Sequence, residues 1–121
     1  MEDRIALEVG VLRELFRNLQ SWRSLYEAEG VDTLSGPRGE SYSLWDVEYL
    51  LENVDKLPPR QAQAIRLYLV EGMREVDAAI QMGLSPSNPI GIYASVGLKK
   101  LISMIEEGLL PRWHASDGVR A

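Results

Sequence analysis

The sequence predicts an all-α fold in which one long amphipathic helix precedes a domain of shorter helices. Apolar residues make up 45% of the 121 residues, enough for a single core. Their spacing follows helical periodicity through most of the chain. Proline and glycine stand where helices would begin and end, at Pro59, Gly72, Gly83, Pro89 and Gly108.

Residues 2–29 are predicted to form the long helix. Its apolar stripe, of period seven with intervening positions filled, consists of Ile5, Leu12, Leu15, Leu19, Trp22 and Tyr26. About 27 residues at 1.5 Å each would span roughly 40 Å, longer than a small domain is wide. The stripe therefore either packs on the helices that follow or joins copies of the chain into a homo-oligomer.

Residues 30–42 contain three glycines and one proline, and are predicted to be a loop and hinge. Ser43 then caps a second helix, with Asp46 three residues on. Its buried face should hold Leu44, Val47, Leu51 and Val54. It should end before Pro58-Pro59.

A third helix should start at Pro59, whose missing N–H costs nothing in a first turn, and stop at Gly72. Its inner face would be Ala62, Ile65 and Leu69. A fourth helix over residues 74–82 should bury Val76, Ala79 and Ile80, and Gly83 should close it.

The last helix is predicted to run from Pro89 to Glu107, with Asn88 as its cap. Its buried face is expected to be Ile90, Ala94, Leu98, Leu101 and Ile105. Gly108 would end it, and residues 109–121 would be a loose tail. Residues 43–108 would thus form one helical domain.

The third, fourth and last of these predicted helices have the layout of a helix-turn-helix. Ala79 is small enough for a close helix crossing, and Gly83, four residues on, can take the positive φ of a tight turn. Many helical hairpins share this pair, so it is weak evidence alone.

The wider pattern resembles region four of bacterial sigma factors and the related response-regulator and phage domains. It comprises Leu57-Pro58, Arg60-Gln61, Tyr68, Glu71-Gly72, Ala79, Gly83-Leu84-Ser85 and Gly97-Leu98-Lys99-Lys100-Leu101. The resemblance covers about 45 residues and implies that the last helix enters the major groove of double-stranded DNA. The residues it would place against DNA are Ser87, Asn88, Gly91, Ile92, Ser95, Lys99 and Lys100.

The last helix departs from the family in the residues that usually read DNA. Positions where relatives carry Arg or His hold Gly91, Tyr93, Ser95 and Val96 here. Arginine is the commonest direct reader of guanine, and Lys and Arg contacts to phosphate supply most affinity. A single copy should therefore bind DNA weakly, and specific binding would need several linked copies.

The resemblance leaves three functions open. The first is a non-enzymatic, sigma-like transcription regulator that binds DNA. The second is a phage small terminase subunit, which recognises DNA for packaging as an oligomer. The third is a protein-interaction module that binds RNA polymerase or a sigma factor without touching DNA.

Charge and composition also bear on the binding partner, the cellular location and the possibility of an enzyme. Residues 1–55 carry a net charge of −7 from 5 basic and 12 acidic side chains, whereas residues 56–104 carry +3 from 6 basic and 3 acidic side chains. A basic segment within an acidic chain fits a surface that binds nucleic acid. Without cysteine, a signal-like start or a long apolar run, a cytoplasmic protein with no membrane span is expected, in a bacterial cell or a phage-infected host. The only histidine, His114, is in the tail and no metal-ligand spacing occurs, so no enzyme, metal or cofactor is expected.

Overall fold

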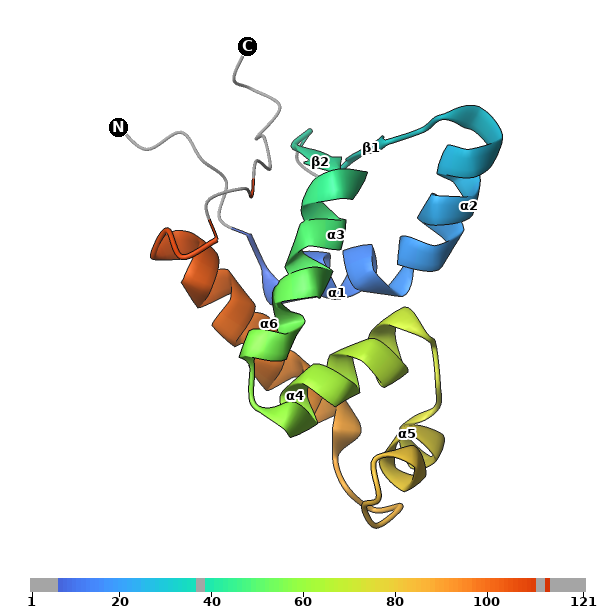
Figure 1. Ribbon diagram of the computed structural model, residues 1–121, viewed down its shortest axis with the longest axis vertical. Coiled ribbons are helices and arrows are strands. Elements are labelled where there is room, and N and C mark those ends of the chain that lie inside the picture. Colours follow the sequence, from blue (N-terminus) through green and yellow to red (C-terminus); the bar gives the residue numbers. More distant parts are fainter. Residues whose placement is uncertain (1–6, 37–38, 111–112, 114–121) are drawn as a thin grey trace.

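The predicted all-α fold is confirmed, with the addition of a small hairpin (Figure 1). The computed structural model describes residues 7–36, 39–110 and 113. Its elements are α1 (Val9–Arg17), α2 (Leu19–Glu29), β1 (Thr33–Ser35), β2 (Ser41–Ser43), α3 (Leu44–Glu52), the 3₁₀ turn η1 (Asn53–Lys56), α4 (Pro59–Ala64), the π-helical η2 (Ile65–Val70), α5 (Glu75–Gln81) and α6 (Ile90–Glu106).

The single long helix predicted for residues 2–29 is wrong, because the chain turns sharply between α1 and α2 at Asn18 (Figure 1). The Asn18 side-chain amide donates to the Glu14 carbonyl at 2.8 Å. Such local side-chain bonds offer the backbone an alternative to continuing the helix. The residues before Leu7, Ile5 among them, lie outside the described part of the chain.

The apolar stripe of the N-terminal half is part of the chain's own core. Of its described members, Leu12 and Leu19 are 0% exposed, Leu15 and Trp22 are buried, and Tyr26 alone is open to solvent. The bend folds both helices back onto the rest of the molecule, where α1 packs against α6 and η2. This burial favours the alternative in which the stripe packs intramolecularly.

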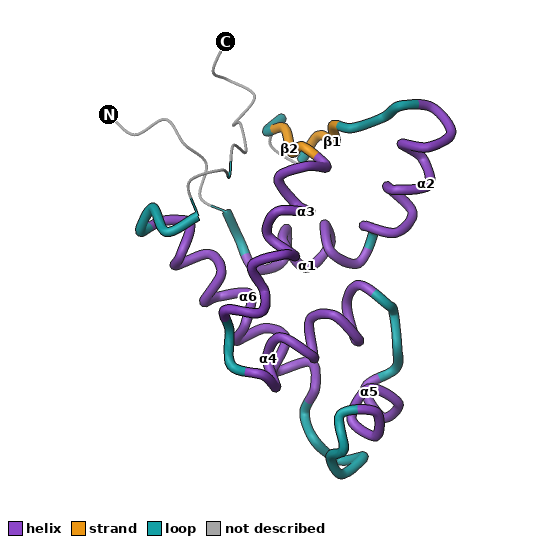
Figure 2. Tube along the Cα trace, in the orientation of Figure 1, coloured by secondary structure: helices purple, strands orange, loops and turns teal. Residues whose placement is uncertain are grey.

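Residues 30–42 are not only a loop, because β1 and β2 pair antiparallel with Leu34 opposite Tyr42 (Figure 2). Tyr42 is buried, and its hydroxyl donates to the buried Glu40 carboxylate at 3.1 Å. Strands of three residues are too short for an alternating pattern to be recognised in the sequence.

The predictions for the second and third helices are confirmed. Ser43 Oγ accepts from the Trp45 N–H at 3.2 Å, and Pro59 occupies the first turn of α4. All the residues predicted for the two inner faces are buried, and Gly72 follows η2 with a φ of 73°.

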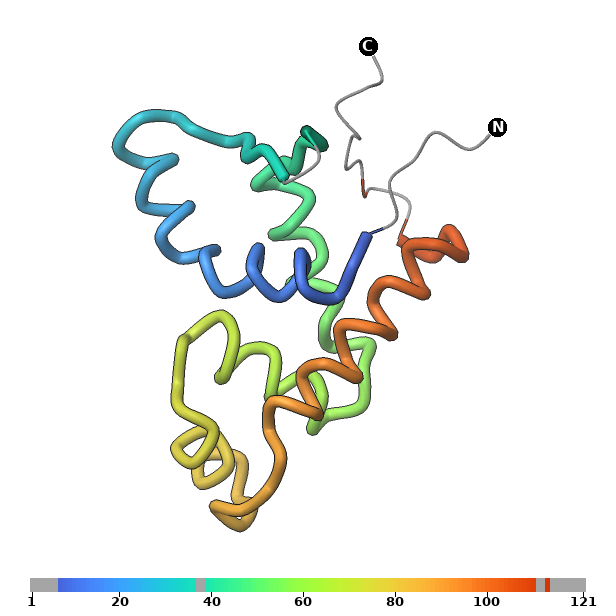
Figure 3. Tube along the Cα trace, turned by 180° about the vertical axis from the view of Figure 1, so that it is seen from behind, coloured from blue at the N-terminus to red at the C-terminus, as the bar shows by residue number. Residues whose placement is uncertain are grey.

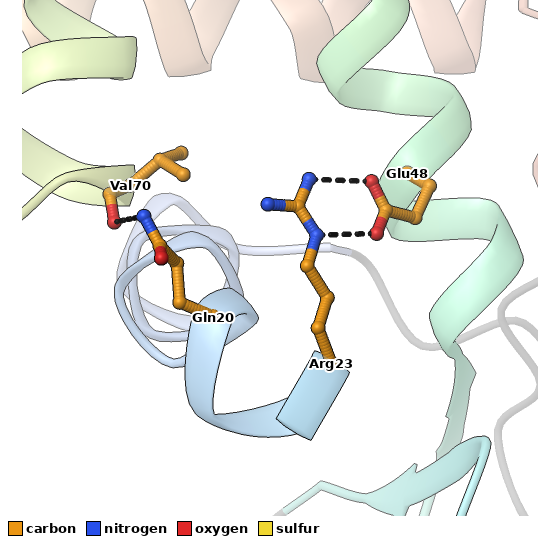
Figure 4. A network of polar contacts seen from close by, with 4 residues as sticks. All are labelled: Gln20, Arg23, Glu48 and Val70. Carbon is orange, nitrogen blue, oxygen red and sulfur yellow. Dashed lines mark hydrogen bonds and ion pairs between the residues drawn. The ribbon is translucent and has the colours of Figure 1, made fainter. Parts of the chain in front are cut away.

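Polar contacts join α2 to two other elements (Figure 4). Arg23 of α2 donates to both carboxylate oxygens of Glu48 in α3, at 2.6 and 2.7 Å. This hydrogen bond raises the pKa of Arg23 above its usual value, so the guanidinium keeps its charge. Gln20 donates to the Val70 carbonyl of η2 at 3.2 Å, which ties the N-terminal half to the helix-turn-helix.

The C-terminal helices differ from prediction at two points. Val76 and Ile80 are 45% and 57% exposed, because the short α5 rests on the core through Ala78 and Ala79. α6 begins one residue later than expected, at Ile90, and its predicted inner face is buried.

Of the tail predicted for residues 109–121, the structure describes residues 109, 110 and 113, and the other positions lie outside its described part. Leu110 is buried, and the Trp113 ring lies 6.2 Å from that of Tyr42. Among the described helices, none combines the length and the apolar character needed to cross a bilayer.

Candidate nucleic-acid interface

The candidate interface is built on α5, a tight turn and α6. Gly83 has a φ of 75°, which lets the Leu84 N–H reach back to the Ala79 carbonyl at 2.9 Å and close α5. Ala79 itself is fully buried, as a close crossing of the two helices requires. Ser85 then accepts from the Ser87 N–H and so orders the turn before α6.

Gly97 allows α6 to approach α4 closely. A Cβ atom at this position would lie 2.9 Å from Ile65 Cδ1 and 3.2 Å from Gln61 Cβ. The glycine therefore serves packing, although it weakens an isolated helix. The opposite face of α6, formed by positions 92, 96, 99 and 103, is left to solvent, with Ile92 61% exposed.

The structure exposes four of the seven residues predicted to meet DNA and engages the other three in contacts of their own. Ser87, Ile92, Lys99 and Lys100 are exposed. Asn88, Gly91 and Ser95 are half-buried.

The three half-buried residues each have a partner within the chain. The Asn88 side chain accepts from the Tyr93 hydroxyl at 2.9 Å, rather than capping α6 as predicted. The Gly91 N–H donates to the Glu75 carboxylate at 2.8 Å, and Ser95 Oγ accepts from Arg13. Asn88 and Ser95 are therefore engaged in contacts within the chain, and their binding to DNA stays a prediction.

Glu75 is a feature that the sequence did not reveal as part of this site. It extends from the first turn of α5 to the first turn of α6 and binds an N–H there. A carboxylate stabilises the positive end of a helix dipole, but it also opposes an approaching phosphate. The N-terminus of α6 thus carries an acid where DNA-binding helices often hold a phosphate.

Three arginines from outside α6 contact α6 itself or the neighbouring η2. Arg13 of α1 donates to Ser95, and Arg17 of α1 lies 5.0 Å above the Tyr68 ring. Arg60 of α4 lies 6.0 Å from the ring centre of Tyr93. The four-residue spacing of Arg13 and Arg17 puts them on one helical face, but no pattern in the sequence predicts that α1 packs beside α6.

These elements define a helix-turn-helix domain whose second helix presents one face to solvent. The family model described as "Sigma-70, region 4" matches residues 48–88, so this part of the chain is a sigma region four-like helix-turn-helix. Domains of this kind bind DNA and are not enzymes. The match covers about a third of the chain and ends at residue 88, two residues before α6 begins. Neither the curated proteins nor the solved structures gave a match to the chain.

Proposed function

We propose that this protein is a non-enzymatic transcription regulator that binds double-stranded DNA through the exposed face of α6. From its resemblance to sigma region four, we further propose that it acts in the cytoplasm of a bacterial cell or of a phage-infected host. The observation that carries the proposal is the exposure of Ile92, Lys99 and Lys100 on α6 and of Ser87 in the turn before it, directly after the segment that matches sigma region four.

The chemistry of that face suits weak, mainly electrostatic binding. Lys99 and Lys100 can contact phosphates, Ser87 can bond to the backbone or to a base edge, and Ile92 can touch a thymine methyl group. No arginine stands on α6 itself. The affinity of one copy for one site is therefore low, and regulation would need a second copy or a partner such as RNA polymerase.

The test is the salt dependence of binding to a fluorescently labelled duplex of mixed sequence, followed by anisotropy from 50 to 200 mM salt. Replacing both Lys99 and Lys100 by Ala should weaken binding to every sequence and lower the salt slope by about 1.8, or 0.9 per phosphate contact.

Lys56→Ala is the matched control, because Lys56 is exposed but belongs to η1 rather than α6. Absence of binding by the unaltered protein at 50 mM salt, or equal slopes for all variants, would refute DNA binding through this face.

A protein-interaction role is the second candidate, and the exposed apolar side chains favour it. Val76 and Ile80 on α5, and Ile92 and Val96 on α6, are between 37% and 61% exposed. Exposed apolar side chains of this size are typical of protein contacts when they form one patch. RNA polymerase or a sigma factor is the partner to test if DNA is not bound. The packaging alternative requires an oligomer, and the buried N-terminal stripe gives it no support.

A further inference from the structure

We infer that Arg13, Arg17 and Arg60, which come from α1 and α4, hold DNA phosphates on the two sides of α6. They would take the place of the basic side chains that α6 lacks. This inference rests on the proposed DNA binding and names the residues that supply most of its affinity.

The ion pairs of the described residues divide the six described arginines into two groups. Arg23, Arg66 and Arg74 each pair with a carboxylate, of Glu48, Asp55 and Asp77 respectively. Arg13, Arg17 and Arg60 form no ion pair within the described part of the chain; they contact a hydroxyl or an aromatic ring instead. Among the described residues, no carboxylate therefore neutralises their charge by direct pairing.

All three uncompensated arginines lie beside α6. Arg13 reaches Ser95, 82 residues away in the sequence. Arg17 covers the Tyr68 ring, whose Cε2 would be 3.7 Å from a Cβ at Gly91. Because Arg13 and Arg17, like Ser95 and Gly91, are one helical turn apart, α1 places its two arginines along one flank of α6. Figure 3 shows α1, in blue, passing beside both α6 and the end of η2.

Arg60 lies on the other flank. On a helix, positions 91 and 95 fall on one side of the exposed face at 92, 96 and 99, and position 93 falls on the other. Arg60 stands over Tyr93 on that second side, which it shares with the exposed Lys100. The exposed face of α6 is thus bordered by uncompensated cations on both sides.

This arrangement matches the geometry of a helix in the major groove. The groove is about 12 Å wide and a helix with its side chains is about as broad, so the two phosphate backbones run along its flanks. Stacking on Tyr68 and Tyr93 orients the guanidinium groups and leaves their N–H groups able to donate to phosphate oxygens. The contacts are to the backbone and carry no base specificity.

The test compares three variants by the duplex titration described above. The double variant Arg13→Gln with Arg17→Gln should lose more than tenfold in affinity at 50 mM salt, and its salt slope should fall by about 1.8. Arg60→Gln should lower the slope by about 0.9. Arg66 already pairs with Asp55 and donates to the Leu51 carbonyl of α3, so Arg66→Gln should change the affinity less than twofold.

A rescue variant separates charge from packing. Arg13→Lys with Arg17→Lys keeps both charges and should retain most of the salt slope, and thermal melting should show all variants folded. If the unaltered protein binds and the Lys99/Lys100 variant binds less well, but the arginine variants behave like Arg66→Gln, this inference is overturned and the proposed function stands. If the unaltered protein does not bind, both fail.

Discussion

Substitution of Gly97 by alanine tests the packing that positions α6. The added Cβ would meet Ile65 Cδ1 at 2.9 Å, Gln61 Cβ at 3.2 Å and Leu57 Cδ1 at 3.4 Å. Alanine gains about 1 kcal/mol of helix propensity over glycine, whereas forcing one extra carbon into a filled site costs about 1–3 kcal/mol. We expect a net loss of about 1 kcal/mol in the free energy of unfolding, and a larger loss for Gly97→Val.

Gly91→Ala is the matched control on the same helix. Its nearest atom would be Glu75 Oε2 at 3.1 Å, the far end of a side chain that can move aside. The propensity gain should therefore prevail, with stability raised by about 0.5–1 kcal/mol. Urea unfolding followed by far-UV circular dichroism measures both values, and the two substitutions should differ by about 2 kcal/mol. Equal stabilisation by both would refute the close crossing of α6 over α4.

Two further substitutions address the acid at α6 and the buried stripe. Glu75→Gln should tighten duplex binding several-fold, because it removes a carboxylate from the N-terminus of α6. It should also cost up to about 1 kcal/mol of stability, because the carboxylate interacts favourably with the helix dipole. Weaker binding in the anisotropy titration would mean that Glu75 positions α6 instead. Leu12→Ala should lower the free energy of unfolding by about 2–5 kcal/mol, against about 0.5 kcal/mol or less for the exposed Leu25→Ala, with no change in light-scattering mass. A change in the light-scattering mass with little loss of stability would instead show that the stripe joins copies of the chain.

The parts of the fold that could be predicted are those fixed by local chemistry. Ser43, Pro59, Gly72, Gly83 and Gly108 mark helix ends where the structure places them, because caps and positive φ depend on one residue and its near neighbours. The buried faces of α3, α4 and α6 follow from periodicity, which long or strongly patterned helices display.

The errors arise where tertiary contacts decide. A seven-residue stripe continues through Asn18, so the sequence gives no sign that the helix turns there. α5 has only seven residues, too few to distinguish its alanine face from the face of Val76 and Ile80.

The helix that carries the candidate site could be predicted from the sequence, but the contacts of its surface residues could not. The last helix could be located from the motif, but the partners of Ser95 and Gly91 come from α1 and α5. Such partners depend on the three-dimensional packing of distant segments. The basic residues beside α6 were missed for the same reason.

The packing of α1 on α6 has a consequence for how the protein is made. A ribosome that has completed residues 48–88 has already produced the segment that matches the family, yet the helix that closes the core against α1 is still to come. Until then α1 lacks one of the helices against which it packs, and the nascent chain must wait for a contact between segments some 80 residues apart. Chains interrupted before Ile90 would thus be substrates for chaperones and proteases, and functional copies would come only from synthesis that has passed α6.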